Sequence, residues 1–424
     1  MSKSEAGRVV AGVVDGEDGY FSRAVAAGGY VFVSGTPVDD EGRFAEAARP
    51  GEPYELSPAA QVSAQTRYVL EMYHELLPQL GSSLVDVLQL EQYVRLKVQS
   101  DGYFRIALSA EFLGRGYPVG ATAQVGGFFP DEAAFGITGL GIVPDEPAGF
   151  VKTYPGDPGD GTTAGRRFSQ VTAAGPYAFT TIFPSDGKTG VPAEARLPDW
   201  IWSGSEIRSE TEWMMAKLET TLSLVGATIA DVVDYTLFLP DVADLYEFDL
   251  AWSGASDAPP PSRTVMPAKG FALPRREGTY GHEQGAPRME IQLRSLIPGK
   301  GAEKVVVDGP GHGVGHQSAG VRGGPLLWIS SQSADPDQRG SVAAEVENTM
   351  DKLATICANG GTTLGSLLRL RALVTEPEHA RVVYKALRRL VPADPPCVSI
   401  VVVSSPLAAK GASVAMDGVA FVES

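Results

Sequence analysis

The chain has 424 residues, 43% apolar and 20% charged, so it is too apolar for a disordered protein and long enough for two to four domains. Its 35 basic and 51 acidic residues give a net charge of −16, which argues against a surface that binds nucleic acid or an anionic membrane. Because it has two cysteines, no long apolar run at its start and no apolar stretch of about 18 residues, we expect a cytoplasmic protein without a disulfide framework, a secretory signal or a membrane span.

The first predicted strands recur twice further along the chain. The segment FSRAVAAGGYVFVSGTP, from Phe21 to Pro37, aligns without a gap with FSQVTAAGPYAFTTIFP, from Phe168 to Pro184. A third version, QSAGVRGGPLLWISSQS, begins at Gln317. In each version a glycine precedes an apolar run, which is typical of a turn that leads into a strand.

An amphipathic helix follows each of these segments and ends at a glycine: Gly81, Gly226 or Gly361. Apolar residues recur at steps of three and four along these helices, which predicts one stripe that packs on a sheet. A strand, a shorter helix and two strands come next, as in VDYTLFL, DVADLYEFDLAW, SRTVMPA and RMEIQLRSL. The sequence therefore predicts an α+β protein of three homologous units, each with the order β-β-α-β-α-β-β.

The predicted units span residues 1–148, 149–300 and 301–424. Polar stretches that contain proline and glycine lie near residues 148 and 300, as expected of boundaries. Strands such as VSIVVVSS are apolar almost throughout, which predicts sheets with both faces buried. Sheet must therefore pack on sheet, either between the three units or between chains.

The repeated unit resembles the RidA/YjgF family, the imine and enamine deaminases once called L-PSP endoribonucleases. The matching pieces are the strand that ends Val33-Ser34-Gly35, the helix–Gly–turn–Asp-Val element, and a proline-led segment near the end of each unit. The resemblance implies a RidA-like, chorismate-mutase-like unit whose sheets pack inward in a trimer, with ligand sites between neighbours. Three copies in one chain imply an intramolecular pseudo-trimer, and further homo-oligomerisation is left open.

The resemblance implies two catalytic residues, both in the second unit. The family arginine of a Pro-x-Arg-Thr segment, which pairs with a substrate carboxylate, matches Arg263 in PSRTV. The family glutamate of the last strand, which positions or activates water, matches Glu290 in MEI. The other two units carry uncharged residues at the corresponding places: Gly120, Gly136, Cys397 and Ala415. We therefore expect one site at Arg263 and Glu290, with the other units as scaffold.

Three more residues of the second unit match substrate-binding positions of the family. Phe168 lies where the family has an aromatic residue over the ligand. Thr181 replaces the serine of the Ser-Gly pair, and Ile182 replaces its glycine. Asp249 lies where the family often has asparagine, and this acid would repel an anionic substrate unless it is protonated or salt-bridged.

Two insertions enlarge the second unit. Residues 185–205 include Trp200 and Trp202, and residues 271–287 include Arg275, Arg276, Tyr280 and His282. Long loops in compact domains tend to be functional, so one interpretation is a lid that places Tyr280 against the substrate. The alternative for the two tryptophans is packing between units, and for the two arginines exposed charge.

We expect neither a metal nor a cofactor. His312 and His316 lie in a glycine-rich loop without an adjacent cluster of acids or cysteines. Cys397 is either a buried inert thiol or a nucleophile with His316 as its base.

The resemblance predicts a hydrolase, metal-independent and suited to specialised metabolism. Arg263 would hold the anionic group of a small-molecule substrate, and Glu290 would orient water toward an imine-like carbon so that ammonia is released. One alternative is a chorismatase-like enol-ether hydrolase, since that family uses related folds in tandem with a late-strand glutamate. The other is a non-catalytic binding or regulatory protein, which the replaced Ser-Gly pair favours.

Overall fold

A computed structural model provides the structure of the protein. It describes residues 8–96, 99–109, 111–113, 117–147, 149–156, 169–185, 190–197, 200, 203–271, 287–310 and 315–423. Helices and strands occur together in every third of the chain, which confirms the predicted α+β class. None of the described helices combines the length and the apolar character needed to cross a membrane.

Three successive stretches of chain share the order β-β-α-β-α-β-β, to which the first and third add a strand at the start and the second adds a short strand before its last one. The first stretch contains β1 (Val9–Gly16), β2 (Gly19–Ala27), β3 (Tyr30–Gly35), α1 (Pro58–Leu76), β4 (Val87–Val94), α2 (Gln99–Ala107), β5 (Val119–Gln124) and β6 (Phe135–Ile142). The second contains β7 (Val171–Ala174), β8 (Tyr177–Ile182), α3 (Glu206–Ser223), β9 (Val232–Leu239), α4 (Leu245–Ala255), β10 (Ser262–Pro267), β11 (Gly270–Phe271) and β12 (Glu290–Leu296). The third contains β13 (Lys304–Val307), β14 (Gly320–Gly323), β15 (Leu326–Ser333), α5 (Val342–Asn359), β16 (Leu367–Val374), α6 (His379–Leu390), β17 (Cys397–Val402) and β18 (Val414–Phe421). The strand β1, of eight residues, and the shorter strands β11 and β13 were not anticipated from the sequence.

Each stretch forms a five-stranded array with one strand order. The first array runs β2-β3-β6-β4-β5, the second runs β7-β8-β12-β9-β10, and the third runs β14-β15-β18-β16-β17. Neighbouring strands are antiparallel except for the last pair of each array, which is parallel. The first and third arrays join through β2 and β17 into one 13-stranded sheet, whereas the second is a separate sheet of five strands.

Turn residues begin and end these elements as the sequence suggests. Gly28, Gly175 and Gly324 have φ values of +57°, +56° and +62° in the turns between the first two strands of each array. This left-handed conformation costs glycine little because it has no Cβ. The Oγ atoms of Ser57 and Ser205 accept from the first-turn N–H groups of α1 and α3, which fixes where these helices begin.

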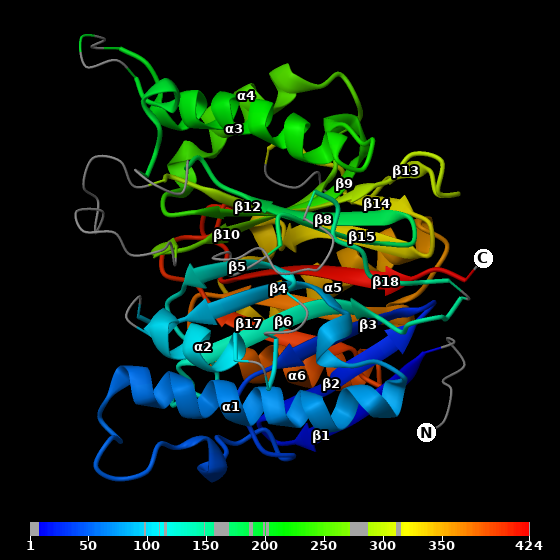
Figure 1. Ribbon diagram of the computed structural model, residues 1–424. Coiled ribbons are helices and arrows are strands. Elements are labelled where there is room, and N and C mark those ends of the chain that lie inside the picture. The colour runs from blue at the N-terminus through cyan, green and yellow to red at the C-terminus, as the bar shows by residue number, and fades with distance from the viewer. Residues whose placement is uncertain are drawn as a thin grey trace.

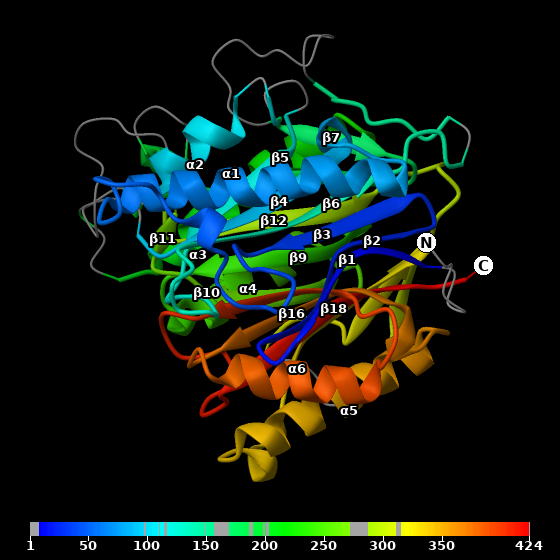
Figure 2. The same ribbon diagram turned by 90° about the horizontal axis from the view of Figure 1, so that it is seen from below.

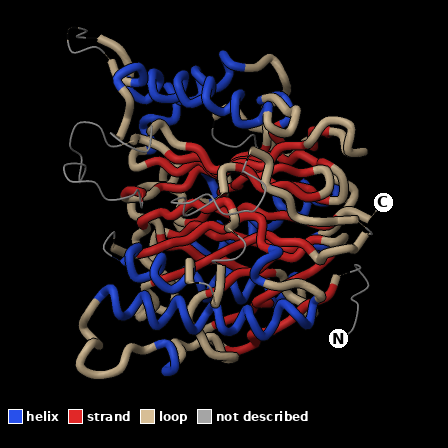
Figure 3. The backbone as a smooth tube through the Cα atoms, viewed as in Figure 1, coloured by secondary structure: helices blue, strands red, loops and turns tan. Residues whose placement is uncertain are grey.

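Helices lie on the outside of the molecule and strands lie inside (Figures 1 and 3). The pair α3 and α4 covers the second array, while α1 with α2 and α5 with α6 cover two other sides (Figure 2). One face of each array packs on its own helices. The opposite faces meet in a shared interior where Phe32, Phe179 and Trp328 belong to one apolar cluster. Both faces of the strands are therefore buried, as predicted.

Candidate functional site

The Arg263 guanidinium is buried and already holds a carboxylate from its own chain. Its backbone N–H on β10 donates to Ser330 Oγ at 2.9 Å. Its side chain donates to both Asp249 carboxylate oxygens and to Gln317 Oε1, the last at 3.2 Å. Burial opposes the charged form, but Tyr235 and Asp249 outweigh it and raise the pKa of Arg263. Asp249 therefore fills the fork expected to receive a substrate carboxylate, and the anticipated repulsion becomes an ion pair.

Backbone from the third stretch closes over this ion pair. The His316 N–H donates to Asp249 Oδ2 at 2.9 Å. Gly315 has a φ of +83°, and a Cβ at this position would lie 2.1 Å from Asp249 Oδ2 and 2.6 Å from Arg263 Nη2. Since even a methyl group does not fit there, a substrate cannot enter between the loop and the pair without moving them.

Arg263 and Glu290 lie on opposite faces of the second array. Strand β9 pairs with β10 on one side and with β12 on the other, so that Arg263 is opposite Tyr235 and Glu290 is opposite Phe238. Side chains alternate along a strand, and positions three residues apart therefore face opposite ways. The register places the two Cα atoms roughly 14 Å apart. Arg263 faces α4 and Glu290 faces the shared interior, so the structure does not bring the predicted pair together.

Glu290 is a buried carboxyl group that keeps its proton at neutral pH. Its side chain is on the interior face, and the residue is 4% exposed. Burial, with a smaller contribution from the negative charge of Glu91, raises the pKa of Glu290 to about 8. Among the residues that the structure describes, its carboxyl group has no hydrogen-bond partner. A neutral carboxylic acid of this kind can donate a proton.

Thr181 shares the interior face with Glu290 and lies beside a cavity. Thr181 pairs with Gln292, two residues along β12 from Glu290, so the two side chains are diagonal neighbours. The Thr181 hydroxyl is buried and has no hydrogen-bond partner in the described part of the chain. A cavity of about 280 Å³, here called the β8 cavity, is lined by Thr181, Ile182 and the Lys217 side chain of α3. Glu290 is not among the residues that line this cavity, because Lys217 belongs to α3 on the helix-covered face of the array and Glu290 is on the interior face.

Lys217 was missed in the sequence although a signal for it exists. The helices α3 and α5 carry the same pattern at the same place, Met215-Ala216-Lys217-Leu218 and Met350-Asp351-Lys352-Leu353. Each lysine donates to a carbonyl at or just after the end of the second strand of its array, Ser185 O at 2.9 Å and Ser333 O at 2.8 Å. A lysine that recurs on the otherwise apolar face of a repeated helix marks a polar position beside the sheet.

Several predicted site residues lie outside the described part of the chain. Phe168 and Tyr280 are among them, as are the loop residues Trp202, Arg275, Arg276, His282 and His312. Trp200 is described and is 81% exposed, so its side chain does not pack between units.

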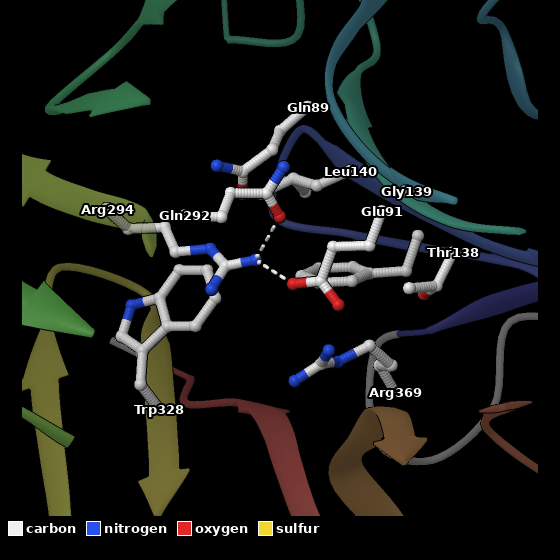
Figure 4. A pocket seen from close by; sticks show the side chains of 10 residues that line it. Gln89, Glu91, Thr138, Gly139, Leu140, Gln292, Arg294, Trp328 and Arg369 are labelled. Atoms are coloured by element: carbon white, nitrogen blue, oxygen red, sulfur yellow. Dashed lines mark hydrogen bonds and ion pairs between the residues drawn. The ribbon is translucent and has the colours of Figure 1, made fainter. Parts of the chain in front are cut away.

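A second small cavity lies at the centre of the molecule, among charged side chains (Figure 4). Arg294 donates to Glu91 Oε1 and to Asp234 Oδ2, each at 2.9 Å. Arg371 donates to Glu91 and to Asp417 Oδ2, the latter at 2.7 Å. The cavity has a volume of about 20 Å³, room for a water molecule and not for a substrate. These charges therefore link the three arrays and do not form a ligand site.

Cys397 and His316, the alternative nucleophile and its base, lie at different places in the structure. Cys397 lies where β17 meets β2, and its Sγ–H donates to Phe32 O at 3.2 Å. Burial raises the pKa of this thiol. His316 lies instead beside Asp249, at the junction of the second and third arrays. Within the described ranges, no group of three or more His, Cys, Asp and Glu side chains is placed to hold a metal ion.

No protein-family model and no curated protein matches the chain. The chain is similar to the crystal structure of a chorismatase, with a TM-score of 0.48 and 14% identity, over 79% of this chain and 93% of that chain. It is similar to RidA from Psychrobacter sp. PAMC 21119 with a TM-score of 0.25 and 22% identity, over 26% of this chain and 92% of that chain. A YjgF/YER057c/UK114 family member from Mycobacterium tuberculosis gives a TM-score of 0.26 and 24% identity, over 28% of this chain and 100% of that chain.

Proposed function

We propose that the protein is a hydrolase that uses protonated Glu290 as a general acid on an enol ether of a small anionic molecule. The observation that carries this proposal is the buried carboxyl group with a pKa of about 8, the diagonal neighbour of a Thr181 hydroxyl that has no partner among the described residues. Thr181 also lines the β8 cavity, where Lys217 of α3 would supply a positive charge for an anionic group. The chorismatase named above is a neighbour of the same reaction type, and the proposal does not rest on that likeness.

The chemistry needs an acid, and Glu290 supplies one. Glu290 would give its proton to the terminal methylene carbon of an enolpyruvyl group, which leaves an oxocarbenium ion and the Glu290 carboxylate. Water then adds to the cationic carbon that bears the ether oxygen and returns a proton to the carboxylate. The resulting hemiketal breaks into an alcohol and pyruvate, so that one water molecule is consumed for each ether bond broken. A general acid of this kind contributes about 10²- to 10⁴-fold to the rate.

The imine-deaminase alternative needs Arg263 to bind the substrate carboxylate. Two observations weigh against it: Asp249 occupies the guanidinium, and Arg263 and Glu290 are on opposite faces of the array. The same occupied guanidinium favours the other alternative, a binding protein without catalysis. Pyruvate release, ammonia release, or ligand-dependent thermal stabilisation without turnover separates the three.

The deciding experiment replaces Glu290 by glutamine. Glu290→Gln should lower kcat/KM for pyruvate release by about 10²- to 10⁴-fold, because an amide cannot donate the proton. The wild-type rate should fall as pH rises through about 8, where the acid loses its proton. A stopped assay of pyruvate from enolpyruvyl ethers, measured between pH 6 and pH 10, reports both effects.

Glu210→Gln is the matched control for this experiment. Glu210 is a second buried glutamate of the same array, whose pKa burial raises to about 7. Its carboxylate accepts from the Arg288 N–H at 2.9 Å, and in the first array Gln65 accepts from the Ala134 N–H at 2.8 Å in the same way. Glutamine is therefore suited to this position, and activity should persist. Equal losses in both variants would contradict the role of Glu290.

We also propose that the three arrays are three RidA-like units, bounded near residues 148 and 300, that form an intramolecular pseudo-trimer. The common strand order and the shared interior support this arrangement. The junctions between neighbouring arrays then carry different residues. Arg263 of β10 lies at the junction with β15 of the third array, and Glu290 of β12 lies at the junction with β5 of the first.

A further inference from the structure

The junctions between neighbouring arrays carry the same pair of hydrogen bonds three times. Ser22, Ser169 and Ser318 occupy one position of the three repeated segments. The backbone N–H of each serine donates to the proline carbonyl just before the parallel strand of a neighbouring array, and its hydroxyl donates to the carbonyl one residue earlier. The N–H acceptors are Pro396 O at 2.9 Å, Pro118 O at 3.2 Å and Pro261 O at 3.1 Å. The third and first arrays therefore meet in the same way as arrays that follow one another along the chain.

A basic side chain also crosses each junction. Arg8, Lys152 and Lys304 each lie one residue before a residue that pairs with the first repeated strand of an array. Each side chain donates to two backbone carbonyls of the neighbouring array. The acceptors are Leu367 O and Asp394 O for Arg8, Val85 O and Val87 O for Lys152, and Ala230 O and Pro259 O for Lys304.

The chain itself spans two of these junctions. It passes from the first array to the second and from the second to the third, which keeps these neighbours at a high effective concentration. The third and first arrays lack such a connection, so that Arg8 and Leu367 are 359 positions apart, against 74 for Lys304 and Ala230. Because closing a longer loop is less favourable, this junction depends more on its noncovalent contacts.

The hairpin of β1 and β2 adds polar contacts at the junction that has no linker. Its tip lies on α6 of the third array (Figure 2). Arg388 of α6 donates to Gly16 O at 2.6 Å and to Asp15 Oδ1 at 2.9 Å. Arg381 of α6 donates to Asp18 Oδ1 at 2.6 Å. Two arginines of the third array therefore hold the turn of this hairpin.

Apolar residues of the same hairpin enter the core of the third array. Val14, Tyr20 and Phe21 belong to the apolar cluster that packs around α5 and α6. The rings of Phe21 and Tyr384 stack with centroids 6.0 Å apart. The Tyr20 hydroxyl donates to Val391 O at 2.7 Å, at the end of α6. The hairpin thus belongs to the first array by its strand pairing and to the third array by its packing.

We propose that Arg8 and the β1–β2 hairpin form a strap that closes a ring of three arrays between the third and the first. Releasing the strap opens the ring at this junction while the two linked junctions stay closed. The inference rests on the proposed pseudo-trimer and is independent of the hydrolase activity of Glu290.

Hydrogen–deuterium exchange of the full chain tests the strap. The backbone N–H groups of Ser22, Ser169 and Ser318 report one junction each, and all three should exchange slowly in the wild type. The double variant Arg381→Met, Arg388→Met should accelerate exchange at Ser22 by about 10- to 100-fold, because charge-assisted hydrogen bonds to the hairpin are lost. Exchange at Ser318 should not change.

Arg389→Met is the matched control for the double variant. Arg389 is an exposed arginine of the same helix, but it pairs with Glu347 of α5 within the third array, so exchange at Ser22 should stay slow. Unchanged exchange at Ser22 in the double variant would overturn the strap alone. Equal acceleration at Ser22 and Ser318 would also overturn it, because this result indicates a general loss of stability. Rapid exchange at all three serines of the wild type would contradict the pseudo-trimer as well.

A second pair of variants tests Arg8. Arg8→Met removes its hydrogen bonds to Leu367 O and Asp394 O and should accelerate exchange at Ser22. Arg8→Lys should keep this exchange slow, because lysine serves at the other two junctions. Slow exchange in a folded Arg8→Met variant would contradict the role of Arg8. If Arg8→Met fails to fold, the variants of α6 decide the outcome.

Discussion

Arg263 and Glu290 lie in different electrostatic environments, although the sequence resemblance matches both to site positions. The arginine is neutralised within the chain by Asp249, which stands where the family often has an uncharged asparagine. Among the described residues no cation acts on the glutamate, and burial keeps it protonated. Asp249 thus keeps the Arg263 guanidinium from binding a substrate carboxylate, whereas the Glu290 carboxyl group stays protonated and able to act as an acid.

The proton on Glu290 should make stability depend on pH. Its pKa of about 8 in the folded protein is above the ordinary value of 4.5, so between these values the folded state holds a proton that the unfolded state has lost. The unfolding free energy should therefore fall as pH rises through this window. Glu290→Gln removes this term, and its Tm relative to wild type should rise between about pH 5 and pH 8. Calorimetry at several pH values measures this difference, and a constant difference would argue against a protonated Glu290.

Strand register and loop placement decide which side chains meet. Because β9 lies between β10 and β12, Arg263 and Glu290 are separated by two strand spacings and by the plane of the sheet. The loop before β14 then covers the Arg263 pair with the backbone of Gly315 and His316. The loop of the third stretch therefore determines whether Arg263 of the second stretch can contact a ligand.

Gly315→Ala should therefore disturb the Arg263–Asp249 pair. The new Cβ would clash with the Asp249 carboxylate, in addition to the strain of a left-handed alanine, which is about 1–2 kcal/mol. Gly226→Ala is the matched control, because Gly226 has a φ of +72° but its Cβ would meet no atom within 4 Å. Urea denaturation should show a larger loss of unfolding free energy for Gly315→Ala. Equal losses would mean that the loop does not press on the pair.

The whole molecule is joined by six buried charges contributed by all three arrays. They are three carboxylates and three guanidinium groups, Glu91, Asp234, Asp417, Arg294, Arg369 and Arg371. Burial alone would raise the pKa of Glu91, but Arg371, Arg294 and Arg369 outweigh it and hold the pKa well below its ordinary range. Since the charges balance only when the arrays are assembled in this way, they favour one arrangement of the chain.

Removing one charge of this cluster should destabilise the entire fold. Glu91→Gln leaves the buried cluster with an excess positive charge, and loss of one partner of a buried ion pair costs about 3–5 kcal/mol. Glu347→Gln removes the partner of Arg389 in an exposed pair and should cost less than about 1 kcal/mol. Urea denaturation of both variants compares the two costs, and a small loss in Glu91→Gln would show that the cluster does not hold the arrays together.

The sequence by itself determined the class, the order of the elements and the burial of the sheets. Helical stripes, turn glycines such as Gly226, and wholly apolar strands are local signals, because each depends on residues only a few positions apart. The repeated order also showed that three stretches are built alike. The lysines of α3 and α5 also carry such a local signal, because they recur at one position of two repeated helices.

Only the tertiary structure decided which side chains face one another. Alternation along a strand separates its residues into two faces, but it does not say which face meets the helices or which strand lies alongside. The separation of Arg263 from Glu290 depends on the strand order of the second array, and the capture of Arg263 by Asp249 depends on how α4 packs on β10. The cover of this pair by Gly315 and His316 depends on the packing of the third array on the second. Contacts between elements that are not neighbours along the chain leave no periodic trace in the sequence.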